Sequence, residues 1–212
     1  MTSYTHIVFD LDETLYPRGS GLFEEMAGRI EAWVERALHL PPEEAQALRR
    51  AYIQRYGTTL GGLIAEQQVD VEDYLAFVHD VPVEALLRPD PALAQMLAAI
   101  PLHRVVFTNG VAEYGWRVLR ALGVDRQFER IVGIREVGLC NKPRLEAYQR
   151  MLTLVGADGP ASIMVDDRAV NLPPAKQLGM TTVLVAGDPG AGVDFVVADV
   201  LEVGALVAEL CK

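Results

Sequence analysis

The sequence predicts an α/β fold with a doubly wound, mainly parallel sheet and an all-helical cap inserted after the first strand. Short, nearly continuous apolar segments indicate the buried strands of a parallel sheet. Helical patterns lie between most of these segments, as in successive strand–helix–strand units. The interval between the first and second predicted strands is roughly ninety residues long, far more than a single crossover helix requires.

The predicted strands are rich in Val, Ile and Phe. They are His6–Phe9, Arg104–Phe107, Ile131–Ile134, Ser162–Val165 and Thr181–Val185, with a weaker one at Asp194–Val197. The helical patterns between the later strands each end at a glycine, which readily adopts the left-handed conformation of a helix C-terminus. These patterns are Ala112–Leu122, Leu145–Val155 and Leu172–Leu178.

The long interval predicts a helical cap domain of residues 17–87, inserted into a core of residues 1–16 and 88–212. Its helices are indicated by apolar residues at every fourth position and by residue types that begin helices. These signals are the stripe Leu22–Leu38, the pair Pro41-Pro42 and the N-cap candidates Thr58 and Asp70.

Composition and charge exclude several classes of protein. The chain has 212 residues, of which 50% are hydrophobic and 23% charged, as in globular proteins. The formal net charge is −10, and Arg49-Arg50, the longest basic segment, fits the polar face of a helix. We therefore expect no nucleic acid polymer as a partner. No apolar segment approaches the ~20 residues that span a membrane. We expect a cytoplasmic monomer or homodimer with no membrane partner.

Polar residues follow the predicted strands at their carboxyl ends, where ligands bind in open α/β sheets. They are Asp10 and Asp12, Thr108 and Asn109, Lys142, and Asp166 and Asp167. Residues two apart project to the same side of an extended chain, so the first pair of aspartates can share one site.

Segments containing these residues resemble, in order, the motifs of the haloacid dehalogenase superfamily. Phe9-Asp10-Leu11-Asp12-Glu13-Thr14 is similar to the first motif, an apolar strand followed by DxDxT. Thr108 is similar to the second and Lys142 to the third. Asp166-Asp167-Arg168-Ala169-Val170-Asn171 is similar to the fourth, DDxxxN. The resemblance covers the whole chain, including the position of the cap.

The resemblance implies phosphomonoester hydrolysis through an aspartyl-phosphate. Asp10 is then the nucleophile, and Asp12 is the acid and base that protonates the leaving oxygen and activates water. Two carboxylates and an anionic substrate repel one another, and Mg²⁺ relieves this repulsion as the implied cofactor. The implied metal ligands are Asp10, Asp12 through its carbonyl, Asp166 and Asp167. The implied phosphoryl contacts are Thr108, Asn109 and Lys142, of which Lys142 also takes part in catalysis.

The expected substrate is a small phosphorylated metabolite. Dehalogenases of the superfamily do not carry the second aspartate, because a halide leaves without a proton, so Asp12 favours an oxygen leaving group. The segments Arg55–Leu63 and Phe77-Val78-His79 resemble the pyrimidine 5′-nucleotidase-like branch, which implies a pyrimidine nucleoside 5′-monophosphate. The alternatives are another phosphomonoester such as a sugar phosphate, a phosphomutase, a dehalogenase, or an inert interaction protein.

Some of these residues have a second explanation. Thr58 and Thr59 either begin a helix or contact the substrate. Asn171 either orients metal ligands or caps a helix, and Thr108 either contacts phosphate or begins a turn. Lys142 alone could be a surface helix start. The 4 histidines show no ligand spacing, so we assign them no chemistry.

Overall fold

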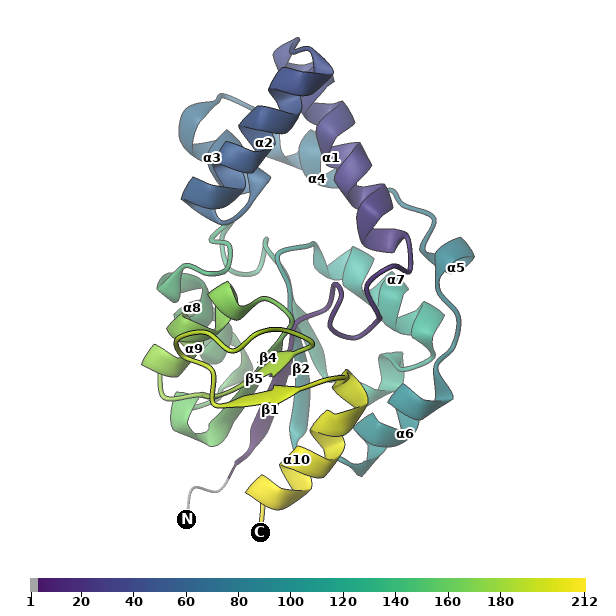
Figure 1. Ribbon diagram of the computed structural model, residues 1–212, viewed down its shortest axis with the longest axis vertical. Coiled ribbons are helices and arrows are strands. Elements are labelled where there is room, and N and C mark those ends of the chain that lie inside the picture. The colour runs from purple at the N-terminus through teal and green to yellow at the C-terminus, as the bar shows by residue number, and fades with distance from the viewer. Residues whose placement is uncertain (1–3) are drawn as a thin grey trace.

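The computed structural model describes residues 4–212 and contains a six-stranded parallel sheet in the order β3-β2-β1-β4-β5-β6 (Figure 1). The strands are β1 (His6–Phe9), β2 (His103–Phe107), β3 (Arg130–Val132), β4 (Ser162–Asp166), β5 (Thr181–Val185) and β6 (Phe195–Val197). Helices cover both faces of the sheet, so the predicted fold class is confirmed. Residues 1–3 of the predicted core lie outside the described residues.

The face of the sheet on which each core helix lies depends on the direction in which the chain moves across the strands. From β1 the chain runs outward to β2 and β3, and α6 (Pro91–Ala99) and α7 (Ala112–Leu122) lie on one face (Figure 1). It then returns to β4 and β5, and α8 (Leu145–Val155) and α9 (Leu172–Gln177) lie on the other face. Helix α10 (Val203–Leu210) packs beside α6. Right-handed crossovers require this change of face where the chain reverses direction.

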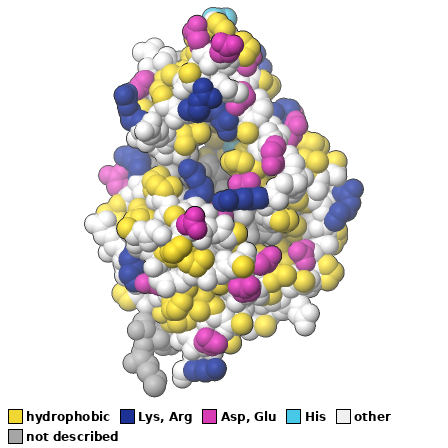
Figure 2. Space-filling view, in the orientation of Figure 1, with side chains coloured by type: hydrophobic (Ala, Val, Ile, Leu, Met, Phe, Trp, Pro, Cys, Tyr) yellow, Lys and Arg dark blue, Asp and Glu magenta, His cyan; other side chains and the backbone are white. Residues whose placement is uncertain are grey.

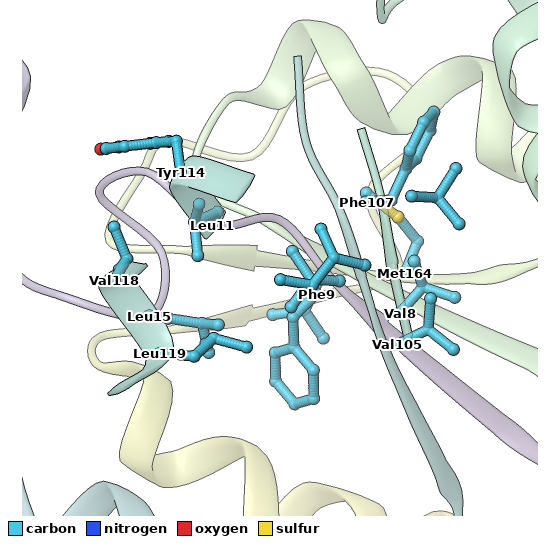
Figure 3. Packing of buried hydrophobic residues seen from close by; sticks show 14 of the residues in the cluster. Val8, Phe9, Leu11, Leu15, Val105, Phe107, Tyr114, Val118, Leu119 and Met164 are labelled. Carbon is cyan, nitrogen blue, oxygen red and sulfur yellow. The ribbon is translucent and has the colours of Figure 1, made fainter. Parts of the chain in front are cut away.

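An apolar core holds the loop that follows β1. Val8 and Phe9 are fully buried in the central strand, and Figure 3 shows them among side chains of the neighbouring strands. Leu11 and Leu15, in the loop, are buried in the same cluster as Leu119 of α7. Burial of one such side chain contributes about 1.5–3 kcal/mol. These leucines therefore anchor the segment that carries the two N-terminal aspartates.

The predicted strand Ile131–Ile134 is wrong at its C-terminal end, because β3 stops at Val132. Gly133 donates its backbone N–H to the carboxylate of Glu136 at 2.9 Å, which turns the chain away from the sheet. Ile134 is nevertheless buried, so its apolar side chain serves the core from a turn. An apolar segment alone does not distinguish the two situations.

Among residues 4–212, three α-helices have no counterpart in the predicted elements: α5 (Val83–Leu86), α6 and α10. Helix α6 does have a local signal, since the carboxylate of Asp90 accepts two backbone N–H groups of its first turn at 3.0 Å each. Helix α5 is a single turn, too short for an apolar period.

A second group of helices lies above the carboxyl ends of the strands in Figure 1, and we call its members the cap helices. They are α1 (Leu22–Leu38), α2 (Pro42–Tyr56), α3 (Thr59–Glu66) and α4 (Val71–Val78). Thr58 is the N-cap of α3, with its hydroxyl accepting the N–H of Gly61 at 2.9 Å. Asp70 caps α4 in the same way. None of the helices within residues 4–212 is long and apolar enough to span a bilayer.

Gly62 and Gly28 are a matched pair of glycines in the cap helices. A Cβ on Gly62 would lie 2.1 Å from Cγ of Tyr52 in α2, whereas one on Gly28 would meet no neighbouring atom within 4 Å. We expect Gly62→Ala to lower the free energy of unfolding by about 1–3 kcal/mol through overpacking. Gly28→Ala should raise it by about 0.5–1 kcal/mol. Urea unfolding measures both, and equal effects would contradict the close packing of α2 on α3.

Candidate active site

The predicted site residues of β1 and β4 meet where the strand order reverses. These two strands are neighbours, and the chain leaves them toward opposite faces of the sheet. The backbone N–H of Asp10 donates to the carbonyl of Val165 at 2.8 Å, which brings Asp10 beside Asp166 at the end of β4. Such a switch point is where open α/β sheets bind ligands.

A buried lysine joins the two strand ends. Lys142 Nζ donates to Asp10 Oδ1 at 2.6 Å and to Asp166 Oδ2 at 2.8 Å, and its side chain is 1% exposed. Burial alone would lower the pKa of Lys142, but the two carboxylates outweigh it and raise that pKa above its usual value. Burial raises the pKa of Asp10, and Lys142 opposes this effect. The lysine therefore stays charged between the carboxylates.

The amide of Asn109 holds the backbone of Lys142. Its Nδ2 donates to the carbonyl of Lys142 at 3.1 Å, and its Oδ1 accepts the backbone N–H of Lys142 at 2.7 Å. Asn141 adds a bond to the cap, since its Nδ2 donates to the carbonyl of Tyr56 at 2.9 Å. These bonds fix the place from which the Lys142 side chain reaches both aspartates.

Asn171 and Arg18 orient the two aspartates that follow β4. Asn171 Nδ2 donates to both carboxylate oxygens of Asp166, at 2.9 and 3.0 Å, and makes no helix-capping bond. Of the two explanations for Asn171, the geometry therefore favours orientation of Asp166. Arg18 Nη2 donates to Asp167 Oδ2 at 2.7 Å. Burial raises the pKa of Asp167, and Arg18 opposes this effect.

Three buried carboxylates form a group that could hold a cation. One oxygen from each of Asp10, Asp166 and Asp167 lies within 4.8 Å of the others. All three donors are oxygens, the ligand type that Mg²⁺ prefers, and they are close enough to repel one another. The chemistry of this donor set fits the predicted metal, with Lys142 and Arg18 offsetting part of the charge.

Asp12 stands apart from this group and is held by two tyrosines that the sequence did not single out. The hydroxyls of Tyr16 and Tyr114 both donate to Asp12 Oδ1 at 2.7 Å. Among residues 4–212, no hydrogen bond to the other oxygen, Oδ2, is present. Burial raises the pKa of Asp12, and the two tyrosines oppose the rise. Tyr114 comes from α7, so no local pattern around Asp12 could indicate it.

The three threonines predicted to contact the substrate differ in how far their hydroxyls are free to do so. Thr108 is buried after β2, and its hydroxyl accepts the N–H of Gly110 at 2.9 Å, as a turn residue does. Its own proton remains available for a ligand. Thr58 is occupied as a helix cap. Thr59 is buried and lines a cavity between the cap helices and the core.

That cavity has a volume of about 140 Å³, and we call it the inner cavity. Asp12, Asn109 and Gly110 line it from the core, while Arg49 and His79 are among its cap residues. A wider groove of about 840 Å³ lies outside it. Figure 2 shows this face hollowed below the cap helices, with Lys and Arg side chains around the opening. The residues shared by the groove and the inner cavity include Arg168.

Arg55 and Tyr56, in the cap segment just before Thr58, line the outer groove. Both donate to Glu66 Oε1, at 2.9 and 2.6 Å, within the cap. The structure therefore does not bring them into the inner cavity. His79 was assigned no chemistry, yet it lies in that cavity with Asp12.

Known proteins resemble this chain in sequence. A family model described as haloacid dehalogenase-like hydrolase matches residues 4–179. A protein from Methanocaldococcus jannaschii, named glyceraldehyde 3-phosphate phosphatase, is 31% identical over 195 residues. The match covers 84% of this chain and 83% of that protein.

Solved structures share the fold. A HAD phosphatase from Thermococcus onnurineus has a TM-score of 0.65 at 18% identity, covering 96% of this chain and 97% of its own. An L-2-haloacid dehalogenase from Xanthobacter autotrophicus has a TM-score of 0.61 at 19% identity, covering 97% and 98%. At these identities the likeness shows the architecture and does not choose between the two reactions.

Replacement of Lys142 by methionine should test the buried ion cluster. Lys142→Met leaves two buried carboxylates uncompensated, so we expect the free energy of unfolding to fall by about 3–5 kcal/mol. The pKa of Asp10 would rise further without the ammonium group. Stability should then be lost as the pH rises above the ordinary carboxyl value of 3.8, so the deficit is smaller near about pH 5 than near about pH 8.

Urea unfolding at both pH values measures this effect. Lys176→Met is the control, because that lysine pairs with Asp194 on the surface and its side chain is 48% exposed. We expect the control to cost less than about 1 kcal/mol. Equal deficits for the two variants, or a deficit for Lys142→Met that does not change with pH, would contradict the cluster.

Proposed function

The chain belongs to the haloacid dehalogenase-like hydrolase family, and we propose that it hydrolyses small phosphomonoesters through an aspartyl-phosphate. One observation carries this proposal. Asp12 has one oxygen held by two tyrosines and a second oxygen free, and it lines the inner cavity next to the proposed nucleophile's loop. A carboxyl group that keeps a proton beside the leaving group can protonate a departing oxygen. A departing halide would need no such proton.

The proposed reaction uses the two N-terminal aspartates in turn. Asp10 attacks phosphorus, an Asp10–phosphorus bond forms and the ester O–P bond breaks, while Asp12 gives its proton to the departing oxygen. Water then attacks phosphorus, the bond between Asp10 and phosphorus breaks, and Asp12 takes the proton from that water. Inorganic phosphate leaves, and both carboxyl groups regain their starting states.

The surrounding residues support both steps by position and charge. Lys142 holds Asp10 at 2.6 Å and offers a positive charge to the phosphoryl oxygens. Tyr16 and Tyr114 keep Asp12 in one orientation, and burial raises their pKa values so that they remain donors. Thr108 is proposed to contact the phosphoryl group, whereas Asn109 positions the Lys142 backbone.

Hydrolases of this family generally use Mg²⁺, and the donor set of this site fits that ion. Asp10, Asp166 and Asp167 would hold it through carboxylates, together with the carbonyl of Asp12. When bound, the cation offsets the repulsion between the carboxylates and an anionic substrate.

The substrate we propose is a small sugar phosphate. The M. jannaschii relative is named for a phosphorylated three-carbon sugar. The inner cavity, at about 140 Å³, also falls below the ≈ 300–1,000 Å³ of sites for larger ligands. A pyrimidine nucleoside 5′-monophosphate remains a prediction, and the phosphate-release screen described next tests both substrates.

A phosphate-release screen tests the reaction and its cofactor together. The panel contains triose and larger sugar phosphates, pyrimidine nucleoside 5′-monophosphates and a 2-chlorocarboxylic acid. We expect phosphate from small sugar phosphates with Mg²⁺, loss of activity in EDTA and recovery when Mg²⁺ is restored. Halide release, activity that EDTA leaves intact, or transfer of phosphate between sugars without release would contradict the proposal.

Replacement of the nucleophile gives a second test. Asp10→Asn keeps the size of the side chain but cannot form the aspartyl-phosphate, so we expect turnover to fall by at least about 10³-fold. Circular dichroism and the unfolding midpoint show whether the variant is folded. Wild-type activity in folded Asp10→Asn would exclude the mechanism.

A further inference from the structure

His79 ends the last cap helix and points one ring nitrogen back into that helix. Its Nδ1 lies 2.8 Å from the carbonyl oxygen of Leu75, one helical turn earlier. A carbonyl only accepts, so Nδ1 carries a proton and donates it. The other nitrogen, Nε2, is then a hydrogen-bond acceptor in the neutral ring. No hydrogen bond to Nε2 is present within residues 4–212.

His79 lines the inner cavity, and its Nε2 lies beside Gly110, which lines the same cavity. The residue is 9% exposed, and its ring lies 5.2 Å from the ring of Tyr114, which binds Asp12. A Cβ built on Gly110 would lie 3.2 Å from Nε2, so this nitrogen approaches the backbone just after Thr108. Burial lowers the pKa of His79, which keeps the ring neutral near neutral pH.

Other polar groups without partners face the same cavity from the cap. Arg49 donates from Nη1 to Glu31 at 2.8 Å, but its Nε is buried and has no partner in the described chain. Tyr74 also lines the cavity, and its hydroxyl makes no hydrogen bond among residues 4–212. The rest of the wall is mainly apolar, including Met26 and Val78. An apolar cavity with a few convergent polar groups is typical of a small-molecule site.

We propose that His79 determines substrate specificity: its Nε2 accepts a hydrogen bond from a hydroxyl on the leaving group. Arg49 lines the same cavity and places its positive charge near that group. The substrate class is then a phosphomonoester of a short polyhydroxylated carbon chain. This inference rests on the proposed phosphatase function and adds to it the residue that selects the leaving group.

The volume of the inner cavity agrees with a short chain. The inner cavity, at about 140 Å³, is smaller than the ≈ 300–1,000 Å³ typical of sites for drug-sized ligands. A three-carbon or four-carbon polyol is smaller than such ligands. A leaving group without a hydroxyl would leave Nε2 unpaired in a buried site.

Two variants separate the ring nitrogens of His79. In His79→Asn the amide nitrogen can still donate to Leu75, but nothing replaces Nε2. In His79→Gln the amide reaches the position of Nε2. Each enzyme is assayed with glycerol 3-phosphate and with propyl phosphate, which has the same carbon chain without hydroxyls. The readout is kcat/KM for each ester, with the thermal unfolding midpoint as a control.

We expect the wild type to prefer glycerol 3-phosphate by about tenfold or more. His79→Asn should lose about tenfold of the preference for glycerol 3-phosphate over propyl phosphate, while His79→Gln retains part of that preference. An equal fall on both esters, or an unchanged preference in His79→Asn, would overturn the role of His79. A wild type that hydrolyses both esters equally would overturn it without any variant.

Failure of the proposed phosphatase function would give a different result in these assays from failure of the role of His79. If the wild type releases phosphate from no ester in the panel, the phosphatase proposal falls and the role of His79 falls with it. If the wild type hydrolyses nucleotides but neither three-carbon ester, phosphatase activity stands and the short-chain substrate class is wrong.

Discussion

Burying a lysine between two carboxylates costs desolvation energy, which their attraction offsets only where the surrounding chain holds all three groups in place. Lys142, Asp10 and Asp166 meet this condition, although they come from three separate segments. The sheet holds Asp10 and Asp166 at neighbouring strand ends, and Asn109 holds the lysine backbone. Strand pairing and the Asn109 bonds therefore together fix one charged cluster. The same cluster holds the Asp10 carboxylate in the site where a ligand would bind.

The sequence predicts the parts of this site that lie next to strands. Asp10, Asp12, Asp166 and Asp167 come at or just after the ends of apolar strands, and the carboxylates of Asp10, Asp166 and Asp167 lie together in the structure. Lys142 was a weaker prediction, because its partners lie 132 and 24 residues away and nothing local reveals them.

Residues that support the aspartates were harder to predict for the same reason. Tyr114 reaches Asp12 from α7, and His79 reaches the inner cavity from the cap. Each occupies an ordinary position in its own helix, and only tertiary packing gives it a polar neighbour. The mainly parallel sheet and the helical nature of the cap followed from apolar patterns, whereas the end of β3 depended on one side-chain bond to Gly133.

The contact between the cap and the lysine loop is made mainly of backbone. Asn141 binds the carbonyl of Tyr56, and a Cβ on Gly57 would lie 2.7 Å from Pro143 and 3.0 Å from the carbonyl of Lys142. Position 57 therefore admits no side chain, and the carbonyl at position 56 that accepts from Asn141 is one that any residue would offer. Cap residues that face the cavity can change without moving the lysine. The chain can acquire new leaving-group preferences while its charged centre stays intact.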